Sequence, residues 1–417
     1  MRAIETVAIV NMKKNTIRWL TRRLLLSALL ALPVSRLGAL DLNLGTNLPP
    51  ITFHGFVSQG FLASTKYNYL GDSRNGSFRF TEAGLNASIN PFPRTRISAQ
   101  GFLFDVGDVG RYEPVLDYAS IEYTFNDYLG LRGGRIRRPQ GIYNTVVDVD
   151  LARTSILLPQ GLYDARWRDF YASLDGGEFF GSLPLRKARS LSYEAYIGYS
   201  HPSTKGGVGH AIHNSLPPGS SVDDFSSPLI AGEQIWWNTP LDGLRAGGAW
   251  LHAFNFKQDI TVNLPPPPFG PGPIKAHADA DVDIAQLSLD YAWKHWTFQT
   301  EYQRLWYSAN SGGGGIVRDS WYAGAAYRFN KWFEAGTYYT EFYGDIHDRD
   351  GAMLAVHSDA YQKDLALSLR FDPANSWILK VEGHYIHGTG LLDDNAANPA
   401  RNNDGWFMLA LKSTFSF

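Results

Sequence analysis

Apolar and polar positions alternate along the C-terminal end of the chain. From Gly405 to Phe417, one parity is apolar except at Ser413. Its apolar members are Phe407, Leu409, Leu411, Phe415 and Phe417. The other parity carries Lys412 and Thr414, so it faces a polar environment. Alternation over this length predicts a β-strand, longer than the about 5–6 residues that are usual in soluble proteins.

The same alternation recurs along most of the chain. Leu365, Leu367 and Leu369 alternate with Ser368 and Arg370, for example. Sixteen candidate strands start near residues 52, 77, 94, 115, 128, 166, 190, 231, 243, 282, 295, 318, 331, 361, 376 and 404. The alternation is least regular near 52, 166 and 231. Strands of about 9–11 residues with one apolar and one polar face are typical of membrane-spanning β-barrels.

The connections between these strands alternate in length. Short ones rich in turn residues fall at 90–93, 126–127, 239–242, 293–295, 330–331 and 372–375. Longer ones rich in Gly, Pro and Asp fall at about 65–76, 105–114, 138–165, 201–230, 257–280, 308–317, 344–359 and 388–403. Only the link at 178–189 is longer than the other short ones. This asymmetry is typical of outer-membrane barrels, which have short periplasmic turns and long extracellular loops.

The predicted fold is therefore all-β, a closed antiparallel transmembrane barrel of about sixteen strands. Closure is required because an open sheet would leave unpaired backbone groups in lipid. A barrel of this size is wide enough for an aqueous lumen. Aromatic residues cluster beside the short turns, as expected of a membrane-interface girdle. They are Trp293, Trp296, Phe329, Trp332, Phe333, Phe371 and Trp377.

The N-terminal residues have the order of a secretory signal peptide. Arg18, Arg22 and Arg23 precede the apolar run 24–32, and Pro33 and small residues follow. We expect residues 1–40 to be cleaved after Sec-type export, with the true start possible at Met12, and residues 41–417 to form the barrel. A short membrane anchor is the alternative. No other stretch approaches 18 consecutive apolar residues, so we expect no transmembrane helix.

The amino-acid composition limits the kinds of partner and site that the chain could have. The formal net charge of −2 gives no global field that would favour nucleic acid. The chain has no cysteine, which excludes disulfides and thiolate metal sites. Aromatic residues make up 14% of the chain, in keeping with interfacial rings in a β-rich protein.

The long connection at 138–165 is unusually apolar for a loop. Its apolar residues include Ile142, Val146, Val147, Leu151, Ile156, Leu157 and Leu158. A loop exposed to solvent would not need them, so we expect this one to fold into the lumen and pack on the inner wall. The strings 134–144 (GRIRRPQGIYN), 155–160 (SILLPQ) and 168–170 (RDF) resemble those of a porin family. The signal peptide, the strand count and Phe417 also resemble sixteen-stranded Gram-negative porins.

That resemblance implies a channel whose third extracellular loop narrows the pore. In general porins this loop carries acidic residues facing a basic wall, and Asp148 and Asp150 resemble the acidic side. The resemblance also implies a homotrimer, outer-membrane lipid and lipopolysaccharide as surroundings, and recognition of a terminal aromatic residue by the barrel-assembly machinery. Phe417 is the matching residue here.

Opposite charges are concentrated around the same loop. Arginines occur at Arg132, Arg135, Arg137, Arg138, Arg153, Arg166 and Arg168, and acidic residues at Asp148, Asp150, Asp164 and Asp169. We expect Asp148, Asp150 and Arg153 at a pore constriction, where facing charges create a transverse field. Arg132 and Arg168 are expected on the wall, as strand residues. The alternative for each residue is a structural ion pair that anchors the loop.

Other charged residues fall on the inward parity of the predicted strands. They are Arg96, Glu122, Glu194, Arg245, Glu301, Arg328, Arg370, Lys380, Glu382 and Lys412. Most are expected to be solvated wall residues. The basic excess near the constriction predicts a weak preference for anions.

Metal binding and catalysis find little support in the sequence. His210 and His213 share one loop, but neither a helix nor a ligand shell is evident. Loop carboxylates at Asp279, Asp281, Asp283, Asp345, Asp348 and Asp350 could bind Ca²⁺, although loops are commonly acidic. We predict no cofactor. No G-x-S-x-G, H-E-x-x-H or P-loop pattern occurs, so we expect a diffusion channel for small polar or charged solutes and no enzyme. The alternatives are a barrel enzyme of the lipase or protease type and a plugged structural or adhesive barrel.

Overall fold

The computed structural model describes residues 39–43, 45, 49–107, 109–268, 270–310, 314–392, 397–398, 401–402 and 405–417. The expected signal peptide, residues 1–40, lies outside these ranges except for its last two residues. Within them, no helix is both long and apolar enough to cross a membrane.

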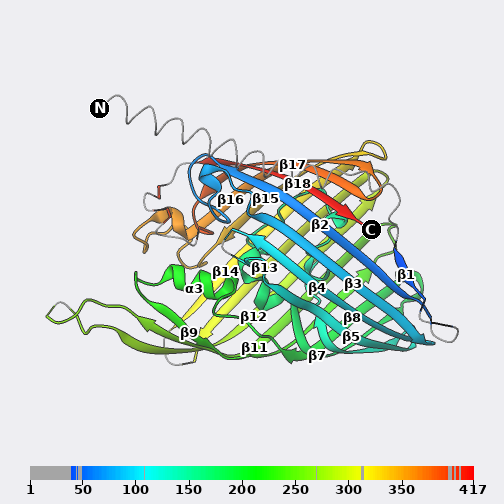
Figure 1. Ribbon diagram of the computed structural model, residues 1–417, viewed down its shortest axis with the longest axis horizontal. Coiled ribbons are helices and arrows are strands. Elements are labelled where there is room, and N and C mark those ends of the chain that lie inside the picture. Colours follow the sequence, from blue (N-terminus) through cyan, green and yellow to red (C-terminus); the bar gives the residue numbers. More distant parts are fainter. Residues whose placement is uncertain are drawn as a thin grey trace. The chain divides into compact units, whose positions relative to one another are not determined.

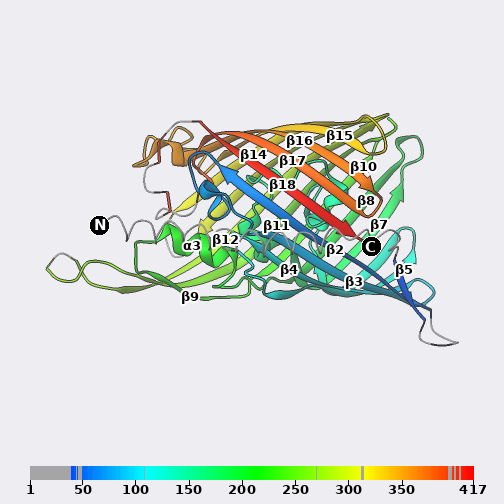
Figure 2. The ribbon, with the colours of Figure 1, turned by 45° about the horizontal axis from the view of Figure 1, so that its top comes forward.

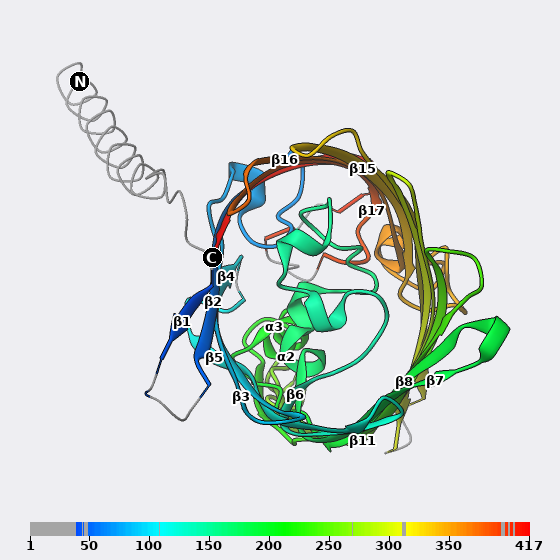
Figure 3. The same cartoon turned by 90° about the vertical axis from the view of Figure 1, so that its right-hand side faces the viewer.

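Sixteen antiparallel strands close into one barrel, as the alternation predicts (Figures 1 and 3). They are β2 (Ile51–Ser64), β3 (Phe80–Phe92), β4 (Thr95–Val106), β5 (Pro114–Asn126), β6 (Leu129–Arg137), β7 (Ser173–Pro184), β8 (Ser190–Tyr199), β10 (Leu229–Asn238), β11 (Leu244–Val262), β12 (Ile274–Trp293), β13 (Trp296–Ala309), β14 (Gly315–Arg328), β15 (Phe333–Tyr343), β16 (Tyr361–Ala374), β17 (Trp377–Gly388) and β18 (Trp406–Ser416). Successive strands pair, β8 pairs with β10, and β18 closes the ring on β2 (Figure 2).

Two short strands extend this sheet, and the described helices are short. Strand β1 (Leu40–Leu42) pairs with β2, and β9 (Ser221–Phe225) pairs with the far end of β11. The helices are η1 (Ser73–Asn75), η2 (Asn144–Val146), η3 (Asp150–Ala152), η4 (Ala165–Trp167), α2 (Arg168–Tyr171), η5 (Arg186–Ala188), α3 (Gly207–Ser215) and η6 (His357–Ala360). In Figure 1, α3 and β9 lie at one end of the barrel and the C-terminus lies toward the other.

The predicted alternation of short and long connections is confirmed. Strands β5 and β6 are joined by residues 127–128 alone, and β12 and β13 by residues 294–295. On the other end, β6 and β7 are joined by residues 138–172, the β6–β7 segment of the following sections. The long link expected at 178–189 is mostly strand, because β7 continues to Pro184 and β8 starts at Ser190.

Two strand boundaries differ from the prediction. The strand expected near 166 starts at Ser173, because residues 165–171 form η4 and α2 instead. The loop expected at 257–280 is largely a hairpin, because β11 runs on to Val262 and β12 starts at Ile274. One face of this hairpin is polar, with Lys257 opposite Asp279 and Asp259 opposite His277, and the other face carries mainly small or apolar residues.

The two faces of the strands differ as the alternation requires. On β18, Phe407, Leu409 and Leu411 are exposed on the outside of the barrel, whereas Met408 and Ala410 are buried inside. Stacked aromatic pairs line the outer face near the short turns, namely Trp296 with Phe298, Trp332 with Phe371 and Trp377 with Phe415. The outer face is therefore apolar with an aromatic rim at the turn end.

The hydrophobic core lies between the inner wall and the β6–β7 segment. Ile156 and Leu157 of the segment are buried with Leu62 of β2 and Trp406 of β18. Leu158 packs in a second cluster with wall tyrosines. Burying each such side chain stabilises the fold by about 1.5–3 kcal/mol.

Candidate functional site

The β6–β7 segment contacts the wall on the opposite side of the barrel. The Glu382 carboxylate on β17 accepts hydrogen bonds from the backbone N–H groups of Ile156 at 2.7 Å and Leu157 at 2.8 Å. Ser368 on β16 donates to the same carboxylate at 2.5 Å, and His384 contacts it at 3.0 Å. In the view along the barrel, the ribbon that carries α2 lies within the ring of strands (Figure 3).

Two wall cations bind carbonyl groups of the same segment. The Lys380 ammonium donates to the carbonyl oxygens of Asp150, Arg153 and Ser155 at 2.8, 2.9 and 3.0 Å. Arg370 also donates to the Arg153 carbonyl, at 3.3 Å. Backbone groups outside a sheet need partners when they are buried. The wall side chains supply them here, so they fix the path of the segment.

Asp150 is the centre of a buried cluster of opposite charges. Its carboxylate lies 3.0 Å from the Lys412 ammonium and 3.6 Å from that of Lys380, and it accepts a hydrogen bond from Thr414 at 2.6 Å. Arg153 lies 3.6 Å away. Burial by itself would raise the pKa of Asp150. The ammonium groups of Lys412 and Lys380 outweigh burial and hold that pKa well below its usual range.

Glu301 on β13 holds the start of the segment. It accepts hydrogen bonds from the Ile142 backbone N–H at 2.9 Å and from the Tyr163 hydroxyl at 2.5 Å. Gly141 comes so close that a Cβ atom there would lie 2.1 Å from the Gln286 amide nitrogen, and its φ is +62°. Glycine is therefore required by both space and backbone conformation at this approach.

A second buried charge cluster joins the segment to β5 and β6. The Arg168 guanidinium donates to Asp148 at 2.6 Å and to Asp117 at 2.7 Å. Arg137 lies 3.1 Å from Asp148 and also pairs with Asp117. Burial would raise the pKa of Asp148, but the two guanidinium groups lower it below its usual value. The ring of Phe102 lies 4.3 Å from the Arg168 guanidinium carbon.

Two residues of this cluster differ from the prediction. Arg168 lies in α2 and not on a strand, because the residues before β7 turn into short helices. Asp117 was not predicted, since it shares the outward parity of Ala119 and Ile121. A bulge in β5 places Tyr118 opposite Gln100 and Leu116 opposite Gly101, which leaves Asp117 as the extra residue. Such a bulge leaves no signal in the alternation beyond an isolated charge on the apolar parity.

The wall near the short turns carries charges that remain accessible. Arg132 on β6 pairs with Glu122 at 2.8 Å and with Glu178 at 3.0 Å, and its side chain is 26% exposed. Arg96 on β4 is exposed, and the described residues offer it no ion pair or hydrogen bond. Glu194 on β8 is half-buried near this group.

Arg328 occupies the equivalent level on the other side of the barrel. It pairs with Glu334 at 2.5 Å and with Asp372 at 2.7 Å, and its side chain is 32% exposed. Like Arg132, it bridges two carboxylates on neighbouring strands. The turn-side wall therefore presents alternating charges to solvent.

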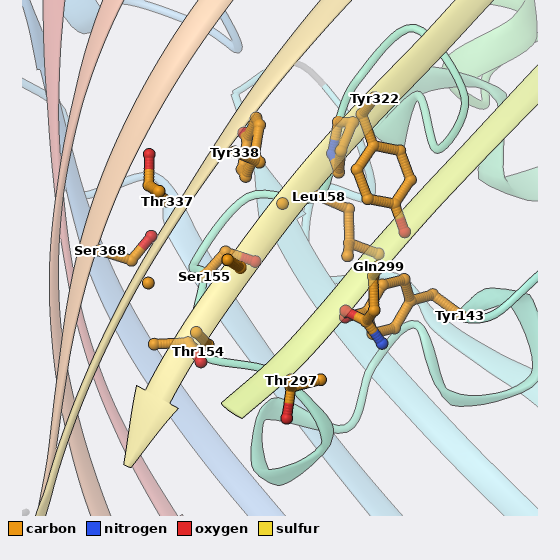
Figure 4. Close-up of a pocket in the computed structure, with 15 residues that line it drawn as sticks. Tyr143, Thr154, Ser155, Leu158, Thr297, Gln299, Tyr322, Thr337, Tyr338 and Ser368 are labelled. Atoms are coloured by element: carbon orange, nitrogen blue, oxygen red, sulfur yellow. The ribbon is translucent and has the colours of Figure 1, made fainter. Parts of the chain in front are cut away.

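A small cavity of about 50 Å³ lies between the segment and strands β13 to β16 (Figure 4). Hydroxyl groups of Tyr322, Tyr338 and Ser368 line it. Each of these hydroxyls already donates within the protein, to Glu301, the Leu157 carbonyl and Glu382 respectively. The space suits about one or two water molecules.

The predicted site residues fall into two groups. Asp148, Asp150, Arg153, Lys380 and Glu382 are buried in the contacts between segment and wall. Their side chains do not face solvent, so they position the segment and set its local field. The accessible members are Arg96, Glu122, Arg132 and Arg328.

Phe417 completes the closure of the barrel. Its N–H donates to the Gly55 carbonyl at 3.0 Å, and its own carbonyl accepts from the Gly55 N–H at 3.2 Å. A Cβ atom on Gly55 would lie 2.6 Å from the Phe417 ring. The terminal residue therefore packs directly on the first strand of the ring.

The metal-site candidates are separated from one another. His210 and His213 lie on helix α3, which the sequence did not reveal. Asp345 and Asp348 accept backbone N–H groups of their own loop. In the described part of the chain, no group of three or more His, Cys, Asp or Glu side chains could hold a metal ion.

No protein-family model and no curated protein matches the chain. Several solved structures have a similar fold. The anion-selective porin from Comamonas acidovorans is 12% identical with a TM-score of 0.52, and the match covers 88% of this chain and 99% of that one. The outer membrane channel DcaP of Acinetobacter baumannii is 12% identical with a TM-score of 0.51, covering 88% and 97%.

Outer-membrane expressed OmpT of Vibrio cholerae is 12% identical with a TM-score of 0.56, and the match covers 90% of this chain and 99% of that one. These low identities mean that the likeness concerns the fold. The chain therefore has the closed sixteen-stranded barrel fold of outer-membrane porins.

Proposed function

We propose that this chain forms a water-filled diffusion channel for small polar or charged solutes in a Gram-negative outer membrane. The observation that carries the proposal is a closed barrel with an apolar outer face and partly exposed charges inside, such as Arg132 and Arg328. A lipid-spanning channel needs both faces. Two of the similar structures are named as a porin and a channel.

Conductance in planar bilayers tests this function. The purified protein is expected to produce stepwise increases in current, and heat-denatured protein serves as the control. A barrel that inserts into the bilayer and carries no current would be a plugged barrel, and the proposal would fail.

We further propose that the β6–β7 segment narrows the lumen. Its contacts with Glu382, Lys380 and Glu301 on distant wall strands support this arrangement. Deleting residues 144–160 is expected to raise the single-channel conductance. A deletion of residues 264–271, at the tip of the β11–β12 hairpin, is the matched control. Equal conductance of both variants and the unaltered protein would contradict the proposal.

A weak anion preference follows from the charges that lack opposite partners. Among the described inward residues, Arg96, Arg138 and Arg318 make no salt bridge with a carboxylate, and the acids Glu194 and Glu301 make none with a cation. Paired charges largely cancel, so the remaining field is weakly positive. The reversal potential in a KCl gradient is expected to have the anion-selective sign. The opposite sign would reject the preference and leave the channel function intact.

The remaining proposals concern assembly and surroundings. We propose Sec-type export with removal of residues 1–40, insertion by the barrel-assembly machinery through Phe417, and contact with lipid and lipopolysaccharide. A homotrimer is proposed as well, because one similar structure is the trimer form of Vibrio cholerae OmpT. Cross-linking of the protein in native membranes tests the trimer, and Phe417→Ser is expected to reduce insertion without changing transcript level.

We propose that the barrel is not a hydrolase. Both ring nitrogens of the buried His384 contact carboxylates, those of Asp364 at 2.9 Å and Glu382 at 3.0 Å. The ring is therefore not positioned as a base for a serine hydroxyl. Lipase and protease assays of purified protein are expected to give background rates, and activity lost in His384→Gln would contradict this.

A further inference from the structure

The outer face of the barrel carries a row of charged pairs near the loop ends of its strands. His252 pairs with Asp283 at 2.9 Å, Arg304 with Asp319 at 2.7 Å, and Lys363 with Glu341 at 3.5 Å. Each side chain lies on the outward parity of its strand. Charges at this level fit the interface between hydrocarbon and headgroups, where they cost little.

Glu233 is an outward-facing charged residue that does not belong to these pairs. It lies near the middle of β10, on the outward parity between Ala231 and Ile235, and it is exposed. The described residues offer its carboxylate no hydrogen bond and no ion pair. Among the described outward positions between the charged pairs and the short turns, it is the only charged side chain. A single charge in the hydrocarbon region of a bilayer raises the free energy of the protein, and a partner of opposite charge would lower this cost.

The surroundings of Glu233 form a groove of about 510 Å³ on the outer face. Trp250 lies directly opposite Glu233 across the β10–β11 pair. Tyr302, Trp306 and Leu287 form further walls, and small residues such as Gly248 form the floor. A carboxylate beside aromatic rings is the usual recognition site of an ammonium group, because ring faces and carboxylate both attract a cation. Arg304 also lines the groove, but its guanidinium is hydrogen-bonded to Asp319, a carboxylate that it shares with Arg349.

A second copy of this chain would not satisfy Glu233. The described outward positions between the charged pairs and the short turns, here called the apolar band, contain no lysine or arginine, and Arg304 beside the band is hydrogen-bonded to Asp319. The apolar walls instead fit a hydrocarbon chain, and the carboxylate fits a positive head. We propose that this groove binds a single-chain amphiphile with an ammonium head, which enters from the lipid phase. The site requires only that the barrel spans a bilayer, so it stands apart from the channel function.

Spin-labelled probes test this site. The intact protein is placed in phosphatidylcholine vesicles with either a spin-labelled alkyltrimethylammonium or a neutral spin-labelled alcohol of the same chain length. Electron paramagnetic resonance then measures the immobilised fraction of each probe. The ammonium probe is expected to bind about fivefold more strongly than the alcohol, which corresponds to about 1 kcal/mol. Glu233→Gln is expected to abolish this preference, and Trp250→Leu to reduce it.

Glu341→Gln is the matched control, because it removes an outward carboxylate that already has a lysine partner. It is expected to keep the preference. Glu233→Gln removes a charge from the apolar band, so folding is not expected to suffer, and circular dichroism checks this. Equal binding of both probes to the unaltered protein, or an unchanged preference in Glu233→Gln, would overturn the proposal. So would efficient disulfide cross-linking of two Ile235→Cys copies in the membrane, since the chain has no other cysteine.

Discussion

Two regions of the inner wall carry similar charged residues but use them differently. On β17 and β18, Lys380 and Lys412 are both 1% exposed, because they contact the β6–β7 segment. On β6 and β14, Arg132 and Arg328 remain partly exposed and bridge carboxylates of neighbouring strands. The residues of both regions occupy the inward parity of amphipathic strands. Their roles differ because the segment covers Lys380 and Lys412, whereas it leaves Arg132 and Arg328 partly accessible near the short turns.

This comparison separates stability from selectivity. Removing a buried charge leaves its partner in a medium of low polarity, so we expect large effects on the β16–β18 side. Removing an exposed charge that has no partner, such as Arg96, leaves no buried charge behind, so we expect a small effect there. Variants of buried and of exposed residues test this distinction.

The largest effect is expected for Asp150→Ala. The change leaves the Lys412 and Lys380 ammonium groups without the carboxylate that they share, although Glu82 still pairs with Lys412. We expect a loss of about 3–5 kcal/mol in the free energy of unfolding. Urea unfolding of the protein in lipid vesicles measures it. Asp350→Ala, in an exposed loop, is the control and is expected to change stability by less than about 0.5 kcal/mol.

A smaller effect on stability but a clear one on current is expected for Lys380→Met. The variant keeps the aliphatic stem and removes the donor to three carbonyl groups of the segment. We expect about 1–3 kcal/mol of destabilisation and a noisier, higher conductance in planar bilayers. Lys363→Met changes a lysine on the outer face, so its conductance is expected to match the unaltered protein. A quiet, unaltered current in Lys380→Met would show that the segment is held without this lysine.

Asp169 is expected to make the stability of the protein moderately dependent on pH. Burial raises the pKa of its carboxyl to about 6, against which the N–H groups of Ser203 and Val208 act. A carboxyl with a raised pKa in the folded state favours folding at low pH. The contribution of Asp169 to the free energy of unfolding is lost as the pH rises from about 4, the pKa of the carboxyl in the unfolded chain, to about 6, its pKa in the folded protein.

Between these pH values, we expect the free energy of unfolding of the unaltered protein to fall by roughly 1–2 kcal/mol because of Asp169. In Asp169→Asn, this part of the fall is expected to be absent. Unfolding measured at several pH values gives this slope directly. The depressed pKa values of Asp148 and Asp150 act below pH 4, so they do not mask it. An identical slope in the variant would mean that Asp169 titrates normally.

The smallest effect is expected for Arg96→Gln on the accessible wall. The side chain has no partner among the described residues, so stability is expected to stay within about 0.5 kcal/mol. The reversal potential in a KCl gradient is expected to move slightly toward cations. Arg94→Gln, in the adjacent turn, tests whether position on the wall matters. A shift of equal size in both variants would argue for a general effect of net charge.

The accessible and buried groups could not be told apart from the sequence. Alternation placed Lys380, Glu382 and Arg132 on the inward face correctly, because parity depends only on the strand itself. Burial depends on which residues lie across the barrel, far away in the chain. Asp117 was not predicted for a related reason. A bulge moves this one residue off the outward face without changing the alternation of the residues around it.

Local sequence patterns were sufficient to predict the number of barrel strands, the order of short and long connections and the outward position of Phe407 and Leu409. These features follow from local alternation and turn chemistry, which each strand carries within its own residues. The three-dimensional fold was needed to show that Arg168 lies in a helix, that Asp150 contacts Lys412, and that Glu233 lies in an aromatic groove without an ion-pair partner among the described residues. Those facts depend on closure of the ring and on packing of the β6–β7 segment, which join residues separated by most of the chain.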